Sequence, residues 1–145
     1  MASIQQILDK KGSEVWSISP ENTVYDALTQ LAEKNVGALL VTQGEKLVGL
    51  ISERDYARKV ILQGKASMAT QVREIMTVKV TSISPGRSVK EAMAVMTEKR
   101  IRHLPVMEEG KIIGVISIGD LVKSIIADQE FVINQLEKYI SGEQY

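Results

Sequence analysis

Apolar positions along the chain change their spacing in a regular way, and these changes predict alternating helices and strands. From Val24 to Leu31 they fall at i, i+3, i+4 and i+7, the spacing of one helix face. Two short apolar runs follow, Ala38 to Thr42 and Leu47 to Ile51, and the glycine-containing turn between them predicts a pair of strands. With a short strand before Ser19-Pro20 and a second helix starting near Ser52, the predicted order is β-α-β-β-α.

The whole pattern occurs twice. When the chain is shifted by 65 positions, which places Ile18 on Ile83, the two copies align without a gap. About a third of the aligned positions are identical, whereas chance would give about one in twenty. Gly49-Leu50-Ile51-Ser52 meets Gly114-Val115-Ile116-Ser117, and Asp55 meets Asp120. The sequence therefore predicts a duplicated βαββα unit.

The second copy carries the same local signals as the first. Ser88 and Glu91 form a capping box before an apolar face that runs from Val89 to Met96, and Thr23 with Asp26 is a weaker version of that box. The strands expected in the second copy are His103 to Met107 and Lys111 to Ile116, and its second helix is expected to start near Ser117.

A single copy buries too little apolar surface to be stable alone, so the two copies are expected to pack together. The fold class is α+β, with two units related by pseudo-twofold symmetry and matched clefts between them. A helix at Ile4 to Leu8 is expected to open the first copy, and one near Val72 to Met76 the second. The expected divisions are residues 1–66, 67–128 and 129–145, the last being an amphipathic C-terminal helix and tail with Phe131, Val132, Leu136, Tyr139 and Ile140.

Composition narrows the possible functions. The chain has 145 residues, and its formal net charge is zero, so it lacks the global field that attracts nucleic acid or anionic membranes. It has no cysteine and one histidine, which argues against thiolate catalysis and against multi-histidine metal sites. No apolar run approaches the roughly 20 residues of a membrane span, and no signal-peptide pattern opens the sequence. The expected location is the cytoplasm.

Several motifs resemble the cystathionine-β-synthase (CBS) domain family. The likeness lies in Gly49-Leu50-Ile51-Ser52-Glu53-Arg54-Asp55, in Gly114-Val115-Ile116-Ser117-Ile118-Gly119-Asp120-Leu121, in Ile75-Met76-Thr77 and in Arg102-His103-Leu104-Pro105-Val106. It covers almost the whole chain, as a tandem pair without a fused catalytic domain. The resemblance implies a paired βαββα fold that often dimerises. It also implies clefts that bind AMP, ADP, ATP, S-adenosylmethionine or NAD(H).

For an adenosine ligand, the second copy offers the fuller set of residues. Asp120 is expected to accept the ribose hydroxyls, while Ser117, Ile118, Gly119 and free N–H groups at the helix start face phosphate. Arg102 and His103 would supply positive charge. The residues expected to wall the base are Leu104, Pro105 and Thr81. A simpler interpretation is that Ser117 and Asp120 only cap the helix, and both roles are compatible.

The first copy has a different set of residues at the matching positions. Its candidates are Trp16, Ser17, Ala38, Leu39, Ser52, Arg54 and Asp55. Gly37-Ala38 replaces Arg102-His103, so the strand-borne cations are lost, while Arg54 replaces Gly119. Trp16 either stacks on a base or fills and blocks the slot. The two clefts are therefore expected to differ, and one of them can be inactive.

The leading hypothesis is a regulatory sensor that binds an adenosine nucleotide and acts on a partner protein through a ligand-dependent conformational change. The alternative is a dimerisation or structural module with empty clefts. An enzyme is disfavoured because the sequence has no nucleophile beside a base, no metal cluster and no G-x-x-x-x-G-K loop, so no catalytic cofactor is expected. Nucleic-acid binding is disfavoured by the neutral charge and the few aromatic residues.

Overall fold

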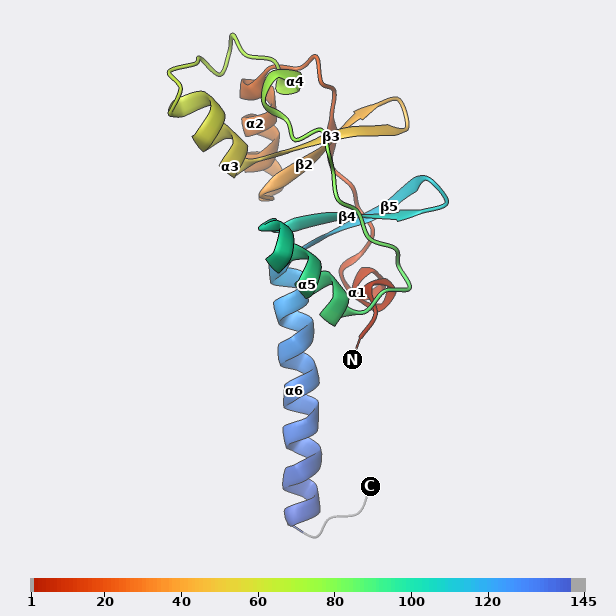
Figure 1. Cartoon of the computed structure of the whole chain (residues 1–145). Helices are drawn as coiled ribbons and strands as arrows, with labels where there is room; N and C mark the ends of the chain where they lie inside the picture. The colour runs from red at the N-terminus through yellow and green to blue at the C-terminus, as the bar shows by residue number, and fades with distance from the viewer. Residues whose placement is uncertain (1, 142–145) are drawn as a thin grey trace. The chain divides into compact units, whose positions relative to one another are not determined.

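The computed structural model describes residues 2–141, and its elements follow the predicted order except that the first strand of the second copy is not formed (Figure 1). The fold class is α+β, as expected, with two βαββα copies. The elements are α1 (Ile4–Lys11), β1 (Ser17–Ile18), α2 (Val24–Lys34), β2 (Ala38–Gln43), β3 (Lys46–Ser52), α3 (Glu53–Tyr56) with a π-helical continuation (Ala57–Ile61), α4 (Val72–Ile75), α5 (Val89–Lys99), β4 (His103–Glu108), β5 (Lys111–Ser117) and α6 (Ile118–Ile140).

The predicted capping boxes are confirmed at the starts of α2 and α5. The Ser88 hydroxyl accepts from the Glu91 N–H at 3.0 Å, and the Thr23 hydroxyl accepts from the Asp26 N–H at 3.1 Å. In both boxes the acidic side chain bonds back to the N–H of the capping residue, so two donors of the first turn are satisfied. Local sequence therefore fixes where these two helices begin.

The chain divides into two compact units that do not coincide with the two sequence repeats. One unit contains the residues up to Ser13, Ile83–Glu108 and the residues from Ile113 on, and the other contains Glu14–Ser82 with Glu109–Ile112. The N-terminal helix α1 therefore belongs to the unit of the second repeat. The expected boundaries at 66 and 128 separate the two repeats along the sequence. The compact units have other boundaries, because each unit combines segments from separate parts of the chain.

In the unit of the second repeat, α1 supplies part of the hydrophobic core. Ile4, Ile7 and Leu8 are buried together with apolar side chains of α5, β4, β5 and α6, including Val89 and Leu104. The Ile4 N–H donates to the Arg87 carbonyl at 2.9 Å and fastens the start of the helix to this unit. Complete burial of a side chain of this kind contributes about 1.5–3 kcal/mol, so α1 is an integral part of the unit.

In the unit of the first repeat, α4 plays the corresponding part. Val72 and Ile75 are buried with the apolar faces of α2, β2 and β3. Just after α4, Thr77 pairs with Leu50 of β3 through two backbone hydrogen bonds of 2.8 and 3.0 Å. Each repeat is thus completed by the short helix that precedes the other repeat in the sequence. The prediction that the helix at Ile4 to Leu8 belongs to the first copy, and the one near Val72 to Met76 to the second, was therefore wrong: the two helices are exchanged.

Two glycines at equivalent positions make room for the exchanged segments. A Cβ atom on Gly114 would lie 2.7 Å from Leu8 Cδ2. A Cβ atom on Gly49 would lie 2.6 Å from Met76 Sδ and 3.0 Å from the Thr77 carbonyl oxygen. Real Cβ atoms do not approach so closely. The lack of a side chain at Gly114 therefore lets α1 pack closely, and the lack of one at Gly49 does the same for the residues that follow α4.

The strands form small sheets within each repeat. β1 pairs in parallel with β2, and β2 pairs antiparallel with β3, with an irregularity between Val41 and Thr42. In the second repeat, β4 and β5 form the equivalent two-stranded sheet. The strand expected before Ser84-Pro85 is reduced to one parallel bridge, in which Ile83 bonds to Pro105 and Met107 at 3.0 and 2.9 Å.

The helix α6 is longer than expected. The sequence indicated a second helix starting near Ser117 and a separate C-terminal helix, and the structure has one continuous helix of 23 residues. Its first turns pack in the unit, where Leu121 is fully buried. Its C-cap is Ser141, and the remainder of the tail, 142–145, lies outside the described residues. Among the helices described, none is long and apolar enough to span a bilayer.

Candidate functional site

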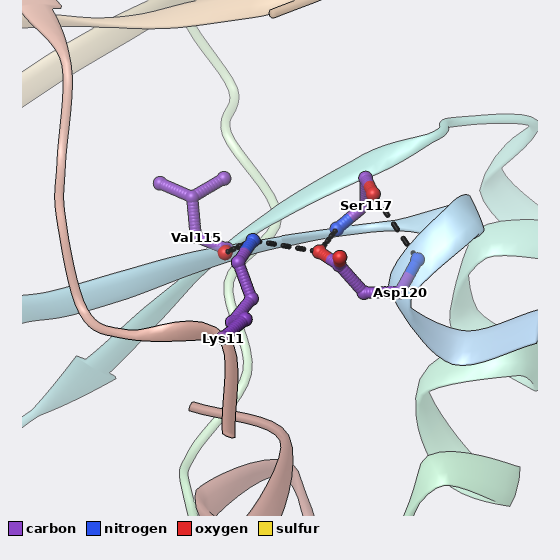
Figure 2. A network of polar contacts seen from close by, with 4 residues as sticks. All are labelled: Lys11, Val115, Ser117 and Asp120. Carbon is purple, nitrogen blue, oxygen red and sulfur yellow. Dashed lines mark hydrogen bonds and ion pairs between the residues drawn. The ribbon is translucent and has the colours of Figure 1, made fainter. Parts of the chain in front are cut away.

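Asp120 is held in one orientation at the start of α6 (Figure 2). Its Oδ2 atom accepts from the Ser117 N–H at 2.8 Å and from Lys11 Nζ at 2.7 Å. The same Lys11 Nζ donates to the Val115 carbonyl at 2.8 Å, which fixes the lysine to β5. The Asp120 N–H donates in turn to the Ser117 hydroxyl at 3.2 Å. Within residues 2–141, no hydrogen bond reaches the other carboxylate oxygen, Oδ1.

The surroundings keep Asp120 ionised. Burial of its side chain acts to raise the pKa, but the hydrogen bonds from Lys11 and from the Ser117 N–H, with the Lys11 charge, outweigh burial and leave the pKa below its ordinary value of 3.8. The side chain is 18% exposed, so it is sheltered yet accessible from one side. The group is therefore a fixed anion with one oxygen available as a hydrogen-bond acceptor.

His103 lies at the head of β4 in the same unit. Burial lowers its pKa below 6.5, and the positive charges of Lys11 and Arg102 act in the same direction, while the Asp120 carboxylate opposes them. His103 is therefore neutral at pH 7, when it is both a hydrogen-bond donor and an acceptor. Arg102 has an exposed side chain, and its carbonyl accepts from the Ile118 N–H at 2.8 Å.

The start of α6 offers fewer free N–H groups than expected. The Ile118 N–H is bonded to Arg102, the Ser117 N–H to Asp120, and the Asp120 N–H to the Ser117 hydroxyl. In the described part of the chain, this leaves the Gly119 N–H as the unpaired donor of the first turn. The expectation of several free amides was wrong because the capping box of Ser117 and Asp120 satisfies two of them and the carbonyl of Arg102 satisfies the Ile118 N–H.

The other predicted residues of this set fall into different environments. Leu104 is fully buried and Pro105 is also buried, so in this structure they can offer a ligand little more than their backbone. Ile118 is half-buried and Gly119 exposed, beside Asp120. Thr81 belongs to the other compact unit, and its part in the site remains a prediction.

A pocket of about 540 Å³ lies between α1 and α6, and Asp120 is part of its wall. This volume is within the range of small-molecule sites. Lysines 10, 11 and 123 line it, so its positive side chains can meet a phosphate. Asp128 also lines it, and its Oδ2 atom is buried without a hydrogen-bond partner in the described residues. Of the residues predicted from sequence, Asp120 is the one found in this wall.

The contribution of Lys11 was missed by sequence reasoning. Lys10 and Lys11 end a short helix that the repeat assigned to the first copy, far from Asp120 in the sequence. Nothing local indicates that the Lys11 side chain reaches the second copy. The one available signal was the presence of Lys10 and Lys11 in the last turn of α1. Basic residues at such a position more commonly interact with the carbonyl groups of their own helix, so the signal did not point to Asp120.

In the first repeat, Asp55 is held by an analogous set of bonds, but both of its oxygens are engaged. Its Oδ2 atom accepts from the Ser52 N–H at 2.9 Å and the Ser52 hydroxyl at 3.1 Å. Its Oδ1 atom lies 3.2 Å from Lys59 Nζ, and that lysine also donates to the Ile75 carbonyl. The Asp55 side chain is 12% exposed, against 18% for that of Asp120, so it is less accessible.

The remaining candidates of the first repeat lie in one unit. Trp16 is half-buried against the core, and Lys34 Nζ sits 4.3 Å from its ring centroid, so one face of the indole is covered by a cation. Leu39 is buried in the core, Ala38 and Arg54 are half-buried, and Ser17 is exposed. Base stacking on the covered face of Trp16 would require Lys34 to move.

The chain belongs to the CBS-domain family, whose family model matches residues 7–61 and 72–127. The CBS domain-containing protein CBSX3, mitochondrial, of Arabidopsis thaliana is 43% identical over 136 residues, which are 90% of this chain and 66% of that protein. A solved structure of a CBS-domain protein from Burkholderia ambifaria is 53% identical, with a TM-score of 0.86, and the match covers 88% of this chain and 96% of that one. The chain thus spans just under two thirds of the length of CBSX3, one of its curated relatives.

A third similarity concerns the fold alone. The CBS domain pair of protein MJ0100, solved in complex with 5′-methylthioadenosine and S-adenosyl-L-methionine, matches with a TM-score of 0.79 at 22% identity. That match covers 88% of this chain and 98% of that chain. The predicted membership of the CBS family and the predicted fold are therefore confirmed.

The lowered pKa of His103 predicts a pH-dependent stability. Unfolding restores the ordinary pKa of 6.5, so the unfolded chain binds this proton first and stability falls as the pH drops from 6.5 toward the folded-state pKa. Thermal unfolding followed from about pH 7.5 to 5.5 should show a shallower loss for His103→Gln than for the unmodified chain. Equal slopes would contradict this effect of burial.

Proposed function

We propose that the chain is a regulatory module that binds an adenosine nucleotide at the start of α6. The observation that carries the proposal is the Asp120 carboxylate, which is anchored through Oδ2 and has Oδ1 available for a ribose hydroxyl. A hydrogen bond between a hydroxyl and a charged carboxylate is about twice as strong as a neutral one. Membership of the CBS family and the adenosine ligands of MJ0100 support this choice of ligand class.

The charges near Asp120 favour a ligand that also carries phosphate. Lys10, Lys11 and Lys123 line the adjoining pocket. Arg102 and the Gly119 N–H, which belong to the same unit, are further donors for an anion. AMP, ATP and NAD(H) combine a ribose diol with phosphate, whereas S-adenosylmethionine has the diol but no phosphate, and its sulfonium and ammonium groups are positively charged. We therefore rank the phosphate-bearing nucleotides ahead of S-adenosylmethionine.

The first-repeat set is proposed as a weaker site. Both oxygens of Asp55 are engaged within the unit, and Lys34 covers one face of Trp16. A ribose at Asp55 has to compete with Lys59 or Ser52, and each exchange of partners reduces the net gain in free energy. The two sites are thus proposed to differ in affinity, with the Asp120 site filled first.

In the proposed mechanism, the nucleotide acts as a signal and is not converted. Binding would favour one conformation of the module over another, and a partner protein would recognise the favoured conformation. The effect requires a difference in nucleotide affinity between the two conformations. We expect this module to act where nucleotides are abundant, and the cytoplasm is the compartment that the sequence favours.

The test is thermal unfolding of the full chain with AMP, ADP, ATP, NAD, NADH and S-adenosylmethionine in turn. A nucleotide at 100 times its dissociation constant should stabilise the fold by roughly 2.7 kcal/mol. Mass spectrometry of any small molecule that copurifies would identify the physiological candidate. No stabilisation by any of the six compounds would favour the alternative, a dimerisation module without a ligand. Turnover of a bound nucleotide would overturn the non-enzymatic role.

A further inference from the structure

The C-terminal half of α6 presents an apolar surface that its own unit does not cover. Figure 1 shows this half of the helix extending beyond α1 and α5 of the same unit. The exposed apolar side chains of α6 are 41–82% accessible: Val122, Ile126, Phe131, Val132, Ile133, Leu136, Tyr139 and Ile140. Apolar side chains that stay in water gain none of the free energy of burial, and a row of them on one helix commonly marks an interaction surface, so a covering surface is expected.

Most of these side chains form one seam. Val122, Ile126, Gln129, Ile133, Leu136 and Ile140 are spaced by four and three residues in alternation, which is the spacing of the a and d positions of a coiled coil. The a positions are Ile126, Ile133 and Ile140, and the d positions are Val122, Gln129 and Leu136. Phe131 lies on the opposite side of the helix. The pattern indicates a partner that is itself a helix with the same repeat.

We infer that this seam pairs with the α6 seam of a second copy of the chain, in antiparallel orientation. In that arrangement, Ile126 of one chain packs on Leu136 of the second copy, and Val122 packs on Ile140 of the second copy. The seam with its apolar neighbours Val132 and Tyr139 presents seven apolar side chains that are 41–82% exposed, and pairing would remove part of this apolar surface from water. The seam is complementary to itself, and its one polar position, Gln129, faces Ile133 of the second copy.

The residues beside the seam decide the orientation. One flank is apolar, with Ile125, Val132 and Tyr139, and the other is charged, with Lys123, Glu130 and Glu137. An antiparallel pair joins like flanks, so Val132 meets its counterpart and Lys123 faces Glu137 of the second copy. Glu130 also meets its counterpart, but these side chains are exposed, where solvent and salt screen the repulsion. A parallel pair would place Glu130 and Glu137 against the apolar flank, where burial of a carboxylate is costly.

A lipid surface fits this helix less well than a second copy does. Amphipathic helices that bind anionic membranes carry a polar face rich in Lys and Arg. The polar side of α6 beyond its first turn has Lys123 and Lys138 against Asp128, Glu130 and Glu137, so its balance is acidic. The charge pattern therefore favours protein over anionic lipid.

The test compares Ile133→Glu with Phe131→Glu as a matched control. Both replace an exposed apolar residue of α6 by the same charge, but Phe131 is off the seam. We expect the full chain to dimerise by sedimentation equilibrium, with Ile133→Glu raising the dissociation constant about 100-fold and Phe131→Glu changing it less than about fivefold. A monomeric wild-type chain, or equal effects of the two substitutions, would overturn the proposal. So would seam-dependent cosedimentation of the monomer with phosphatidylserine vesicles.

Cross-linking tests the orientation, because the described chain has no native cysteine. In an antiparallel pair, a mixture of Val122→Cys and Ile140→Cys chains forms a disulfide between the two variants on mild oxidation. In a parallel pair, each variant instead cross-links to itself. Predominant mixed disulfides support the inference, and predominant self-disulfides contradict the antiparallel arrangement. Circular dichroism and thermal unfolding of every variant establish that the fold is retained.

Discussion

Substitution of Asp120 by asparagine is expected to reduce nucleotide affinity about 10- to 100-fold. The ribose hydroxyl loses a charged acceptor, and hydrogen bonds to charged groups contribute about 1.5–3 kcal/mol. Asparagine has nearly the same shape, and its carbonyl oxygen can still accept from the Ser117 N–H, so the start of α6 should be retained. Isothermal titration calorimetry with the nucleotide that stabilises the unmodified chain measures the loss directly.

Two further variants separate binding from structure. Lys11→Met removes the ion pair of Asp120 and one lysine of the adjoining pocket, so it should weaken the binding of a phosphate-bearing nucleotide. The affinity for adenosine, which has the ribose diol but no phosphate, should change less than about fivefold, because a partly exposed ion pair contributes about 0–1 kcal/mol. Asp55→Asn should reduce affinity less than Asp120→Asn, because both oxygens of Asp55 already have partners. If Asp120→Asn binds as tightly as the unmodified chain, the ribose assignment is wrong.

The elements of this fold could be predicted from sequence because their signals are local. The capping pairs at Ser88 and Thr23 fixed the starts of two helices, and short apolar runs beside glycine-containing turns fixed the four long strands to within a residue or two. The repeat strengthened these predictions, because the same helix and strand signals occur at equivalent positions in both copies. A capping pair or a hairpin turn depends on residues within a few positions, and sequence alone contains that information.

The exchange of α1 and α4 could not be predicted in this way. The two short helices are equivalent in the repeat, so the sequence is equally compatible with each helix packing on its own copy or on the other copy. The choice depends on which helix end can reach the core without strain, which is a tertiary property. The position of Lys11 beside Asp120 depends on that choice, and for this reason the lysine was not among the candidate residues.

The difference between the two repeats was only partly predictable. The loss of strand-borne cations in the first copy and the substitution of Arg54 for Gly119 could be read from aligned positions. The engagement of both Asp55 oxygens could not, because it depends on the rotamers of Ser52 and Lys59. An i, i+4 pair such as Asp55 and Lys59 is common on helices, and its presence in the sequence does not say whether the carboxylate remains available.

Substitution of Leu8 by alanine is expected to destabilise the unit of the second repeat by about 2–5 kcal/mol, the usual cost of removing a buried leucine side chain. Leu8 is 4% exposed and lies against Gly114. Gly114→Ala alone should cost about 1–3 kcal/mol, because its new methyl group would overlap Leu8 Cδ2. In the double variant, the alanine methyl occupies space that Leu8 leaves, so the combined loss should be smaller than the sum. Denaturant unfolding of the four chains gives this coupling.

The matched control for that cycle is Gly49→Ala, the equivalent position of the first repeat. Gly49 contacts Met76 and Thr77, not Leu8, so its effect should add to that of Leu8→Ala within about 0.5 kcal/mol. A coupling of roughly 1–3 kcal/mol for Gly114, with none for Gly49, is the result expected if α1 completes the second repeat. The opposite pattern, with Leu8 coupled to Gly49 and independent of Gly114, would mean that α1 packs on the first repeat in solution.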